Sequence, residues 1–99
     1  RDRADVEVFR EDALPEMLCV RAWRSGDRMT VLGHGSARKV KDVFNDQNVP
    51  FHLRASIPLL LAGEVIIWIP GVRRARFGLL RDMHRKQELV ILRYREQRQ

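Results

Sequence analysis

A chain of 99 residues can bury one small hydrophobic core, and a composition of 44% hydrophobic and 32% charged residues excludes a disordered segment. The longest apolar runs, residues 57–63 and 65–69, fall well short of the roughly 20 residues that span a bilayer, so a membrane helix is excluded. The net charge of +6 favours an anionic partner, while the single cysteine, Cys19, excludes an internal disulfide and fits a reducing, cytoplasmic setting.

The first 30 residues predict two strands. Val6, Val8 and Phe9 indicate a short strand, and in residues 18–22 alternate side chains are apolar, which is typical of a strand with one inward face. Residues 25–27 have the sequence Ser-Gly-Asp, whose side chains favour turns, and they end this second strand.

A short amphipathic helix is predicted after the loop at residues 33–36, with Ser36 as its N-cap. Its apolar face follows the i, i+3, i+4, i+7 spacing and contains Val40, Val43, Phe44 and Gln47. At 100° per residue, one flank holds Arg38, Lys41 and Asn45, and the other holds Lys39, Asp42 and Asp46. Asn48 ends the helix, and Pro50 opens a second short helix through about residue 55.

The second half predicts strands. Residues 59–62 and 65–69 flank a turn at Gly63-Glu64, and because both runs are continuously apolar we expect a central hairpin buried on both faces. A last strand is expected over residues 89–94, and residues 96–99 are expected to fray. The fold class is therefore α+β, a single domain over residues 1–99 with a small mixed or antiparallel sheet and one or two short helices. Since the sequence begins with Arg1 rather than Met, we expect this domain to be a piece of a longer protein.

The positive charge falls in two separate blocks. Residues 17–41 contain six basic residues against Asp27 alone, and residues 73–99 contain nine basic residues against three acids. The remaining segments, 1–16 and 42–72, are net acidic. If the two basic blocks meet in the fold, they form the electrostatic footprint of a nucleic-acid-binding protein; the alternative is a solvated basic surface.

Candidate phosphate ligands gather around the glycine loop at residues 33–35. Arg21 and Arg24 precede the turn at Gly26, and Arg38 and Lys41 follow the loop. Arginine and lysine bind phosphate by charge-assisted hydrogen bonds, and the loop amides with the helix N-terminus are a further expected anion site. In the alternative interpretation, Arg38 pairs with Asp42 one turn on. Asp27 is expected to cap its turn or to orient Arg24 and Arg28.

No set of catalytic or metal-binding residues stands out. Asp42 and Asp46 are an i, i+4 carboxylate pair, which we interpret as a solvated charge cluster with Lys39 beside it. The three histidines have no ligand spacing with Cys19, so no metal site is predicted. His34 lies in the glycine loop, where it is placed to touch a phosphate or stack on a base. Trp68 is assigned to the core, whereas Trp23 is a possible stacking platform for a base.

Several ordered motifs resemble the C-terminal domain of bacterial tRNA(Ile)-lysidine synthetase. They lie within residues 18–73: Arg21-x-Trp23-Arg24-x-Gly26-Asp27, Leu32-Gly33, Lys39-Val40-Lys41-Asp42-x-Phe44-x-Asp46-x-x-Val49-Pro50, Leu53-Arg54, Pro58-Leu59-Leu60 and Ile66-Ile67-Trp68-Ile69-Pro70-Gly71-x-Arg73. Beyond Phe77 the similarity fades, so the Arg-rich stretch is interpreted from its chemistry alone and residues 73–86 are assigned no role.

The resemblance implies a tRNA-binding module that contacts the acceptor stem and is related to a domain of the phenylalanyl-tRNA synthetase β-subunit. In that family a separate N-terminal domain uses ATP and magnesium to attach lysine to the wobble cytidine of tRNA(Ile). That domain carries a Ser-Gly-Gly-x-Asp-Ser loop, which this chain lacks. The expected partners are therefore tRNA(Ile) and the N-terminal domain, with a homodimer also possible, and no cofactor or catalytic residue is expected in this domain.

On this hypothesis the RNA-binding residues are Arg21, Arg24, Arg28, His34, Arg38, Lys39, Lys41, Arg54 and Arg73. The alternative hypothesis is a docking or dimerisation module, in which the arginines pair with acidic groups of another domain or subunit and RNA is not contacted. A small enzyme that acts alone is the third and most distant possibility.

Overall fold

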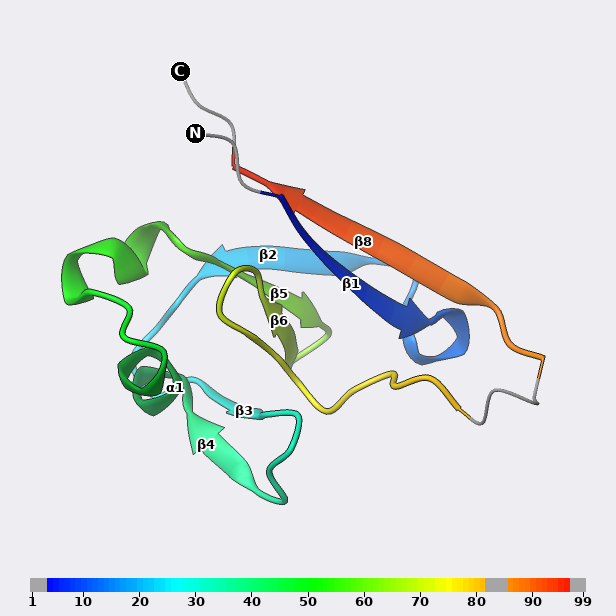
Figure 1. Ribbon diagram of the computed structural model, residues 1–99, viewed down its shortest axis with the longest axis horizontal. Helices are drawn as coiled ribbons and strands as arrows, with labels where there is room; N and C mark the ends of the chain where they lie inside the picture. Colours follow the sequence, from blue (N-terminus) through cyan, green and yellow to red (C-terminus); the bar gives the residue numbers. More distant parts are fainter. Residues whose placement is uncertain (1–3, 82–85, 97–99) are drawn as a thin grey trace.

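The computed structural model describes residues 4–81 and 86–96 (Figure 1). In chain order its elements are β1 (Ala4–Arg10), the 3-10 helix η1 (Glu11–Ala13), β2 (Leu18–Ala22), β3 (Arg28–Thr30), β4 (Ala37–Lys39), α1 (Val40–Asp46), the 3-10 helix η2 (Phe51–Ser56), β5 (Pro58–Ala62), β6 (Val65–Ile69), β7 (Arg73–Arg74) and β8 (Leu89–Arg95). All strand pairs are antiparallel, which confirms a small α+β domain. No helix in the described part of the chain is long and apolar enough to cross a membrane.

A four-stranded sheet in the order β2-β5-β6-β7 forms the middle of the molecule. The predicted hairpin is its centre, with β5 and β6 joined at Gly63-Glu64. Its continuous apolar sequence is explained by burial on both faces. Leu59, Leu61, Ile66 and Ile69 face one core, while Ala62, Ile67 and Trp68 face another. The assignment of Trp68 to the core is confirmed, since it is 3% exposed.

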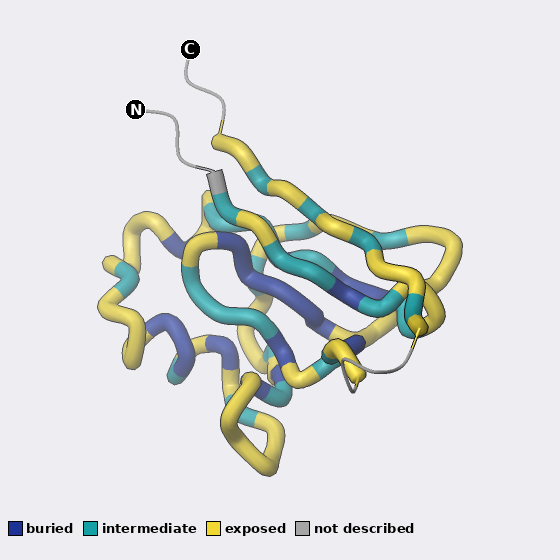
Figure 2. The backbone as a smooth tube through the Cα atoms, turned by 45° about the vertical axis from the view of Figure 1, so that its right-hand side comes forward, coloured by how far each residue is buried: buried dark blue, intermediate teal, exposed yellow. Residues whose placement is uncertain are grey.

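The two cores are covered by different elements. On one side, β3 and α1 contribute Met29, Val40, Val43 and Phe44. On the other side, β1 and β8 form a two-stranded ribbon whose inner residues, led by the fully buried Phe9, pack on the sheet. Figure 2 shows the buried backbone concentrated in the central strands and α1, with exposed and half-buried residues alternating along β8.

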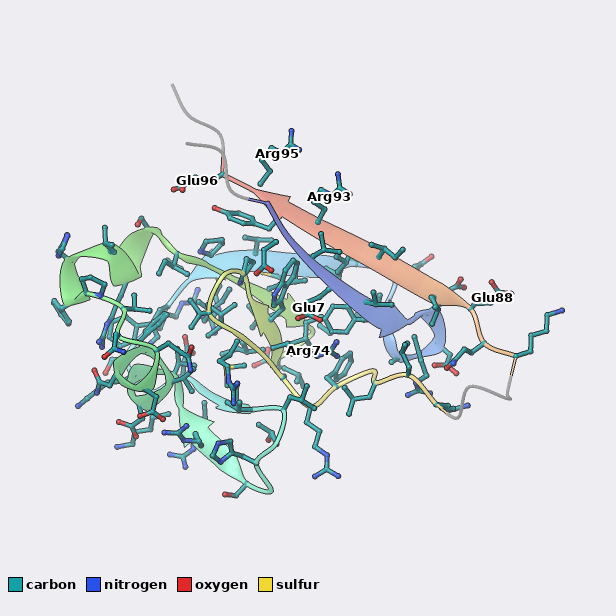
Figure 3. The ribbon with its side chains drawn as sticks, viewed as in Figure 1. Glu7, Arg74, Glu88, Arg93, Arg95 and Glu96 are labelled. Carbon is teal, nitrogen blue, oxygen red and sulfur yellow. The ribbon has the colours of Figure 1, made fainter. Side chains whose placement is uncertain are left out.

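Arg74 fastens the β1–β8 ribbon to the central sheet (Figure 3). Its Nη1 donates to a Glu7 carboxylate oxygen at 3.0 Å and to the Val8 carbonyl at 2.9 Å. Its guanidinium carbon lies 4.4 Å from the centroid of the Phe9 ring. One side chain of β7 therefore holds the ion pair, a backbone contact and an aromatic contact of β1 together.

The helix begins three residues later than predicted, because Ser36 as N-cap would place the first helical residue at Ala37. Residues 37–39 instead form β4, which pairs with β3 as a hairpin, and α1 starts at Val40. Residues 37–39 are a strand and not the first turn of the helix because they pair with β3. In this pairing Arg38 is the cross-strand neighbour of Met29, which is buried in the first core. The predicted end of the helix at Asn48 is confirmed, since Asn48 has the left-handed φ of 57° that ends helices.

Candidate nucleic-acid interface

The β3–β4 hairpin places two like charges opposite each other. Arg28 and Lys39 are cross-strand partners, and both side chains are exposed. Opposite residues of an antiparallel pair lie with their Cβ atoms about 5 Å apart, and like charges in that position destabilise the sheet. An anion bound between the two cations would offset this repulsion.

The second basic block joins this hairpin through backbone pairing. Val31 and Ala75 form an antiparallel bridge, with Arg76 N–H donating to the Thr30 carbonyl at 2.7 Å. Because alternate residues of a strand share a face, Arg76 lies on the same side of this pairing as Thr30 and Arg28. The two basic blocks therefore meet at Arg76, while Arg93 and Arg95 of the second block lie on β8.

Two further exposed cations lie where the chain enters the hairpin and where it leaves. Arg24 lies in the turn before β3. In the same turn, the Asp27 carbonyl accepts the Val40 N–H at 2.9 Å, which joins the turn to the start of α1. Lys41 lies in the first turn of α1. We define the basic hairpin surface as Arg24, Arg28, Lys39, Lys41 and Arg76. Over residues 4–81 and 86–96, none of these five makes an ion pair.

Arg21 is held within the domain instead of being offered to a partner. Its two terminal nitrogens donate to the two Asp27 carboxylate oxygens at 2.8 and 2.9 Å. The hydrogen bonds from Arg21 lower the pKa of Asp27, and those to Asp27 raise the pKa of Arg21. Asp27 caps its turn as predicted, by accepting the Arg24 N–H at 2.8 Å. The carboxylate orients the Arg21 side chain, however, and not the side chains of Arg24 and Arg28.

Arg38 is also engaged, and on the other face of the hairpin. It lies beside Met29 in the register and forms an ion pair with Asp46 at 2.5 Å, so the alternative pairing with Asp42 is wrong. The predicted flank of Arg38 with Lys41 is wrong too, because Arg38 belongs to β4 and only Lys41 to α1.

Arg54 is buried, with 7% of its surface exposed. The prediction that it binds phosphate is therefore wrong. Its Nε and Nη2 donate to the Val49 carbonyl at 3.1 and 2.9 Å, and Nη2 donates to Asn45 Oδ1 at 2.7 Å. A guanidinium with these partners is satisfied internally and pins the chain between α1 and η2.

The remaining two predicted residues lie near the tip of the hairpin. His34 is exposed in the turn between β3 and β4, where its N–H donates to the Val31 carbonyl at 3.0 Å. Arg73 is half-buried, and its Nη2 lies 3.4 Å from the Leu32 carbonyl oxygen. The structure therefore brings His34 and Arg73 to one end and the basic hairpin surface to the other.

The predicted phosphate site that combined the glycine loop with the helix N-terminus is not formed. β4 separates the two, and the first helical N–H, that of Val40, already donates to the Asp27 carbonyl. Arg76 was missed in the choice of individual residues, and the only sequence signal for it was the charge of the second basic block.

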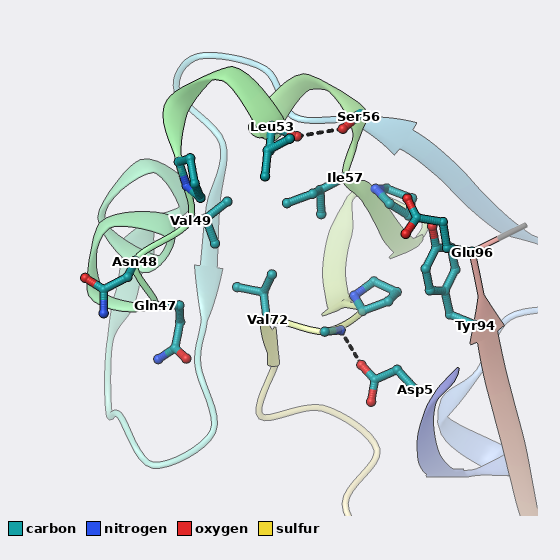
Figure 4. Close-up of a pocket in the computed structure, with 14 residues that line it drawn as sticks. Asp5, Gln47, Asn48, Val49, Leu53, Ser56, Ile57, Val72, Tyr94 and Glu96 are labelled. Atoms are coloured by element: carbon teal, nitrogen blue, oxygen red, sulfur yellow. Dashed lines mark hydrogen bonds between the residues drawn. The ribbon is translucent and has the colours of Figure 1, made fainter. Parts of the chain in front are cut away.

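A cavity lined by η2, the segment that follows α1 and the end of β8 has a different character (Figure 4). It has a volume of about 450 Å³, and carboxylates of Asp5 and Glu96 lie at its rim with no Arg or Lys among its lining. Asp5 accepts a hydrogen bond from the Gly71 N–H there. Two carboxylates disfavour a phosphate, so this cavity does not belong to the basic hairpin surface. In the same described part, no three His, Cys, Asp or Glu residues lie close enough to hold a metal ion.

Comparison with known proteins gives consistent matches. The family described as "TilS substrate C-terminal domain" matches residues 18–91. The tRNA(Ile)-lysidine synthase of Geobacter sulfurreducens is 45% identical over 76 residues, which are 77% of this chain and 16% of that protein. The bifunctional protein TilS/HprT of Listeria innocua is 35% identical over 79 residues, 78% of this chain and 12% of the relative. The chain thus spans about a sixth or less of these relatives' length.

A solved structure agrees. The crystal structure of a TilS C-terminal domain superposes with a TM-score of 0.77 at 30% sequence identity, covering 93% of this chain and 69% of the other.

Proposed function

Because this chain belongs to the TilS substrate C-terminal domain family, we propose that it binds tRNA through the basic hairpin surface. The observation that carries the proposal is the exposed Arg28–Lys39 pair with Arg76 alongside. Phosphates of an RNA backbone offset the repulsion within this group. Such contacts position the RNA without reading its sequence, and the narrow major groove of A-form RNA makes shape recognition of a stem the expected mode.

In this proposal the chain is the RNA-gripping part of a tRNA(Ile)-lysidine synthase that acts in the cytoplasm. The ligation of lysine to the wobble cytidine, with ATP and magnesium, belongs to an N-terminal domain, and this domain holds the acceptor stem of tRNA(Ile). Support comes from the similarity to enzymes of that name and from Arg28, Lys39 and Arg76, which lie on one face of the strand pairing.

The test is binding of the 99-residue chain to tRNA(Ile) and to its isolated anticodon hairpin over a salt series. We expect the full tRNA to bind and the hairpin not to, with a log–log salt slope of several units. Lys39→Ala removes one phosphate contact and is expected to lower the slope by about one unit.

Arg38→Ala is the matched control, since it removes one positive charge from the same β4 strand but from a side chain already paired with Asp46. Its slope should stay at the wild-type value. Equal losses in both variants would mean that net charge alone drives the binding, and the basic hairpin surface would not be the interface.

A docking or dimerisation module is the second candidate. It is favoured by the outer face of the β1–β8 ribbon, where Val6, Leu89 and Ile91 are 43%, 45% and 66% exposed. Under this hypothesis no RNA binds even at low salt, and light scattering of the 99-residue chain gives the mass of a dimer.

A further inference from the structure

A column of side chains in contact, with edge-to-face and cation–π geometry, runs from the first core to the surface and ends in Phe51. The Trp23 and Phe44 rings meet edge to face, with their centroids 5.7 Å apart. The guanidinium carbon of Arg54 lies 5.3 Å from the Phe44 centroid and 5.8 Å from the Phe51 centroid. Phe44 is fully buried, Arg54 is 7% exposed and Phe51 is 76% exposed. The column therefore fixes an aromatic ring at the surface of the molecule.

The support beneath Phe51 is rigid. Arg54 is held by hydrogen bonds to the Val49 carbonyl and to Asn45 Oδ1, so its guanidinium cannot swing away. Pro50, with a φ of −58°, precedes Phe51 at the start of η2. A single exposed apolar residue is ordinary, but a phenylalanine backed by a buried guanidinium that is hydrogen-bonded through Nε and Nη2 presents a pre-ordered flat surface.

Helix α1, which holds Arg54 through Asn45, also carries an exposed cation. Asn45, which accepts the hydrogen bond from Arg54, is one helical turn after Lys41, so Lys41 and Asn45 share a face of α1. Lys41 is a member of the basic hairpin surface and makes no ion pair with the described residues. Exposed aromatic rings and unpaired cations on one domain suit single-stranded nucleic acid, because bases stack while phosphates pair with cations.

We propose that Phe51 is a stacking platform for one unpaired base of the bound RNA, with Lys41 on the adjoining phosphate. The proposal rests on the RNA binding proposed above and adds to it that a single-stranded nucleotide next to the gripped stem is recognised. Phenylalanine has no hydrogen-bonding group, so the platform accepts any of the four bases. Stacking requires a planar ring at position 51, whereas an apolar docking patch would accept any apolar side chain there.

The experiment compares two RNA hairpins with the same stem, one blunt-ended and one carrying a single-stranded tail of about four nucleotides. For the wild-type chain we expect the tailed RNA to bind about tenfold more tightly at fixed salt, as one stacked base allows. Phe51→Ala and Phe51→Leu should lose that advantage while keeping the affinity for the blunt hairpin. Phe51→Trp should retain it, because the flat ring is preserved.

A fluorescent base analogue, 2-aminopurine, in the tail adds a direct readout, since stacking on Phe51 quenches it. We expect quenching with the wild-type chain and with Phe51→Trp, and none with Phe51→Ala. Met17→Ala is the matched control, because Met17 is 82% exposed and precedes β2 at the end remote from η2. Thermal unfolding of each variant checks that the fold is intact.

Four outcomes overturn the platform. Equal binding of the blunt and tailed hairpins, or a tail advantage that survives Phe51→Ala, overturns it while leaving the proposed RNA binding in place. If Phe51→Leu still binds the tailed hairpin more tightly than the blunt one, apolar contact explains the preference and stacking does not. Failure of the wild-type chain to bind either RNA at low salt removes the proposed function and the platform together.

Discussion

Arg21 and Asp27 face each other across the turn that leads into β3, six residues apart in sequence. With the Arg24 N–H also bound, the Asp27 carboxylate accepts three hydrogen bonds and its pKa is lowered, chiefly by Arg21. The pair is largely shielded from solvent, with side-chain exposures of 19% and 12%. This bonding fixes the turn from which Arg24 projects and through which β2 reaches the hairpin.

The lowered pKa of Asp27 predicts how stability depends on pH. Since the folded-state pKa lies below the ordinary value of about 3.9, the contribution of this carboxylate is fully present above pH 4 and is lost as pH falls through the folded value. In urea unfolding at pH 7, Asp27→Asn should lower the free energy of unfolding by about 2 kcal/mol. The variant should also lose less stability between pH 4 and pH 2 than the wild type. Parallel pH curves for the two proteins would contradict this role.

At the scale of elements, the β1–β8 ribbon is the part most dependent on a few contacts. A two-stranded ribbon is marginal by itself and needs packing on another layer. Its attachment includes the buried ring of Phe9 and the bonds of Arg74 to Glu7 and Val8. The two strands are otherwise joined mainly to each other, through pairs from Ala4↔Arg95 to Arg10↔Leu89.

Arg74→Ala is therefore expected to loosen the ribbon selectively. Loss of this largely buried guanidinium leaves the Glu7 carboxylate and the Val8 carbonyl without their Arg74 hydrogen bonds. The free energy of unfolding should fall by about 3 kcal/mol. Native-state hydrogen exchange should show faster exchange of the paired amides of β1 and β8, with the amides of β5 and β6 changed less. Arg76→Ala, two residues further on and exposed, is the control and should leave both groups unchanged.

The elements that could be predicted from sequence are those with their own strong pattern. The β5–β6 hairpin is apolar throughout and has a glycine turn, and β8 alternates cleanly, so both were predicted within a residue or two. β3 and β4 are three residues each, too short for a period, and β4 begins where the helix was expected. The ion pairs of Arg21 and Arg38 span six and eight residues. Such spacings follow from the register of a turn and a hairpin and not from helical periodicity.

On the scale of the whole molecule, one sheet separates two cores that each contain a tryptophan. Trp23 packs against the first core and Trp68 lies in the second. Phe77 packs against both. Since β5 and β6 contribute side chains to the two cores at once, neither core can lose its packing without disturbing the strands that support the other.

We therefore expect a single cooperative unfolding transition. Trp68→Phe leaves Trp23 as the only fluorophore of that kind, and Trp23→Phe leaves Trp68, so each variant reports one core. In each variant, the urea midpoint from tryptophan fluorescence should coincide with the midpoint from far-UV circular dichroism. Separate midpoints in the Trp23→Phe variant would show that the core beneath the ribbon opens first.

The pairing of Ala4 with Arg95 places the two ends of the ribbon at the same edge of the molecule (Figure 1). A force applied between these two residues acts across the ladder and not along it, so the hydrogen bonds of β1 and β8 carry the load one pair at a time. The ribbon should then unzip at low force, while the central sheet, whose strands are not pulled directly, keeps its shape until the ribbon has opened to Arg10 and Leu89. We therefore expect the β1–β8 ribbon to yield at a lower force than the central sheet.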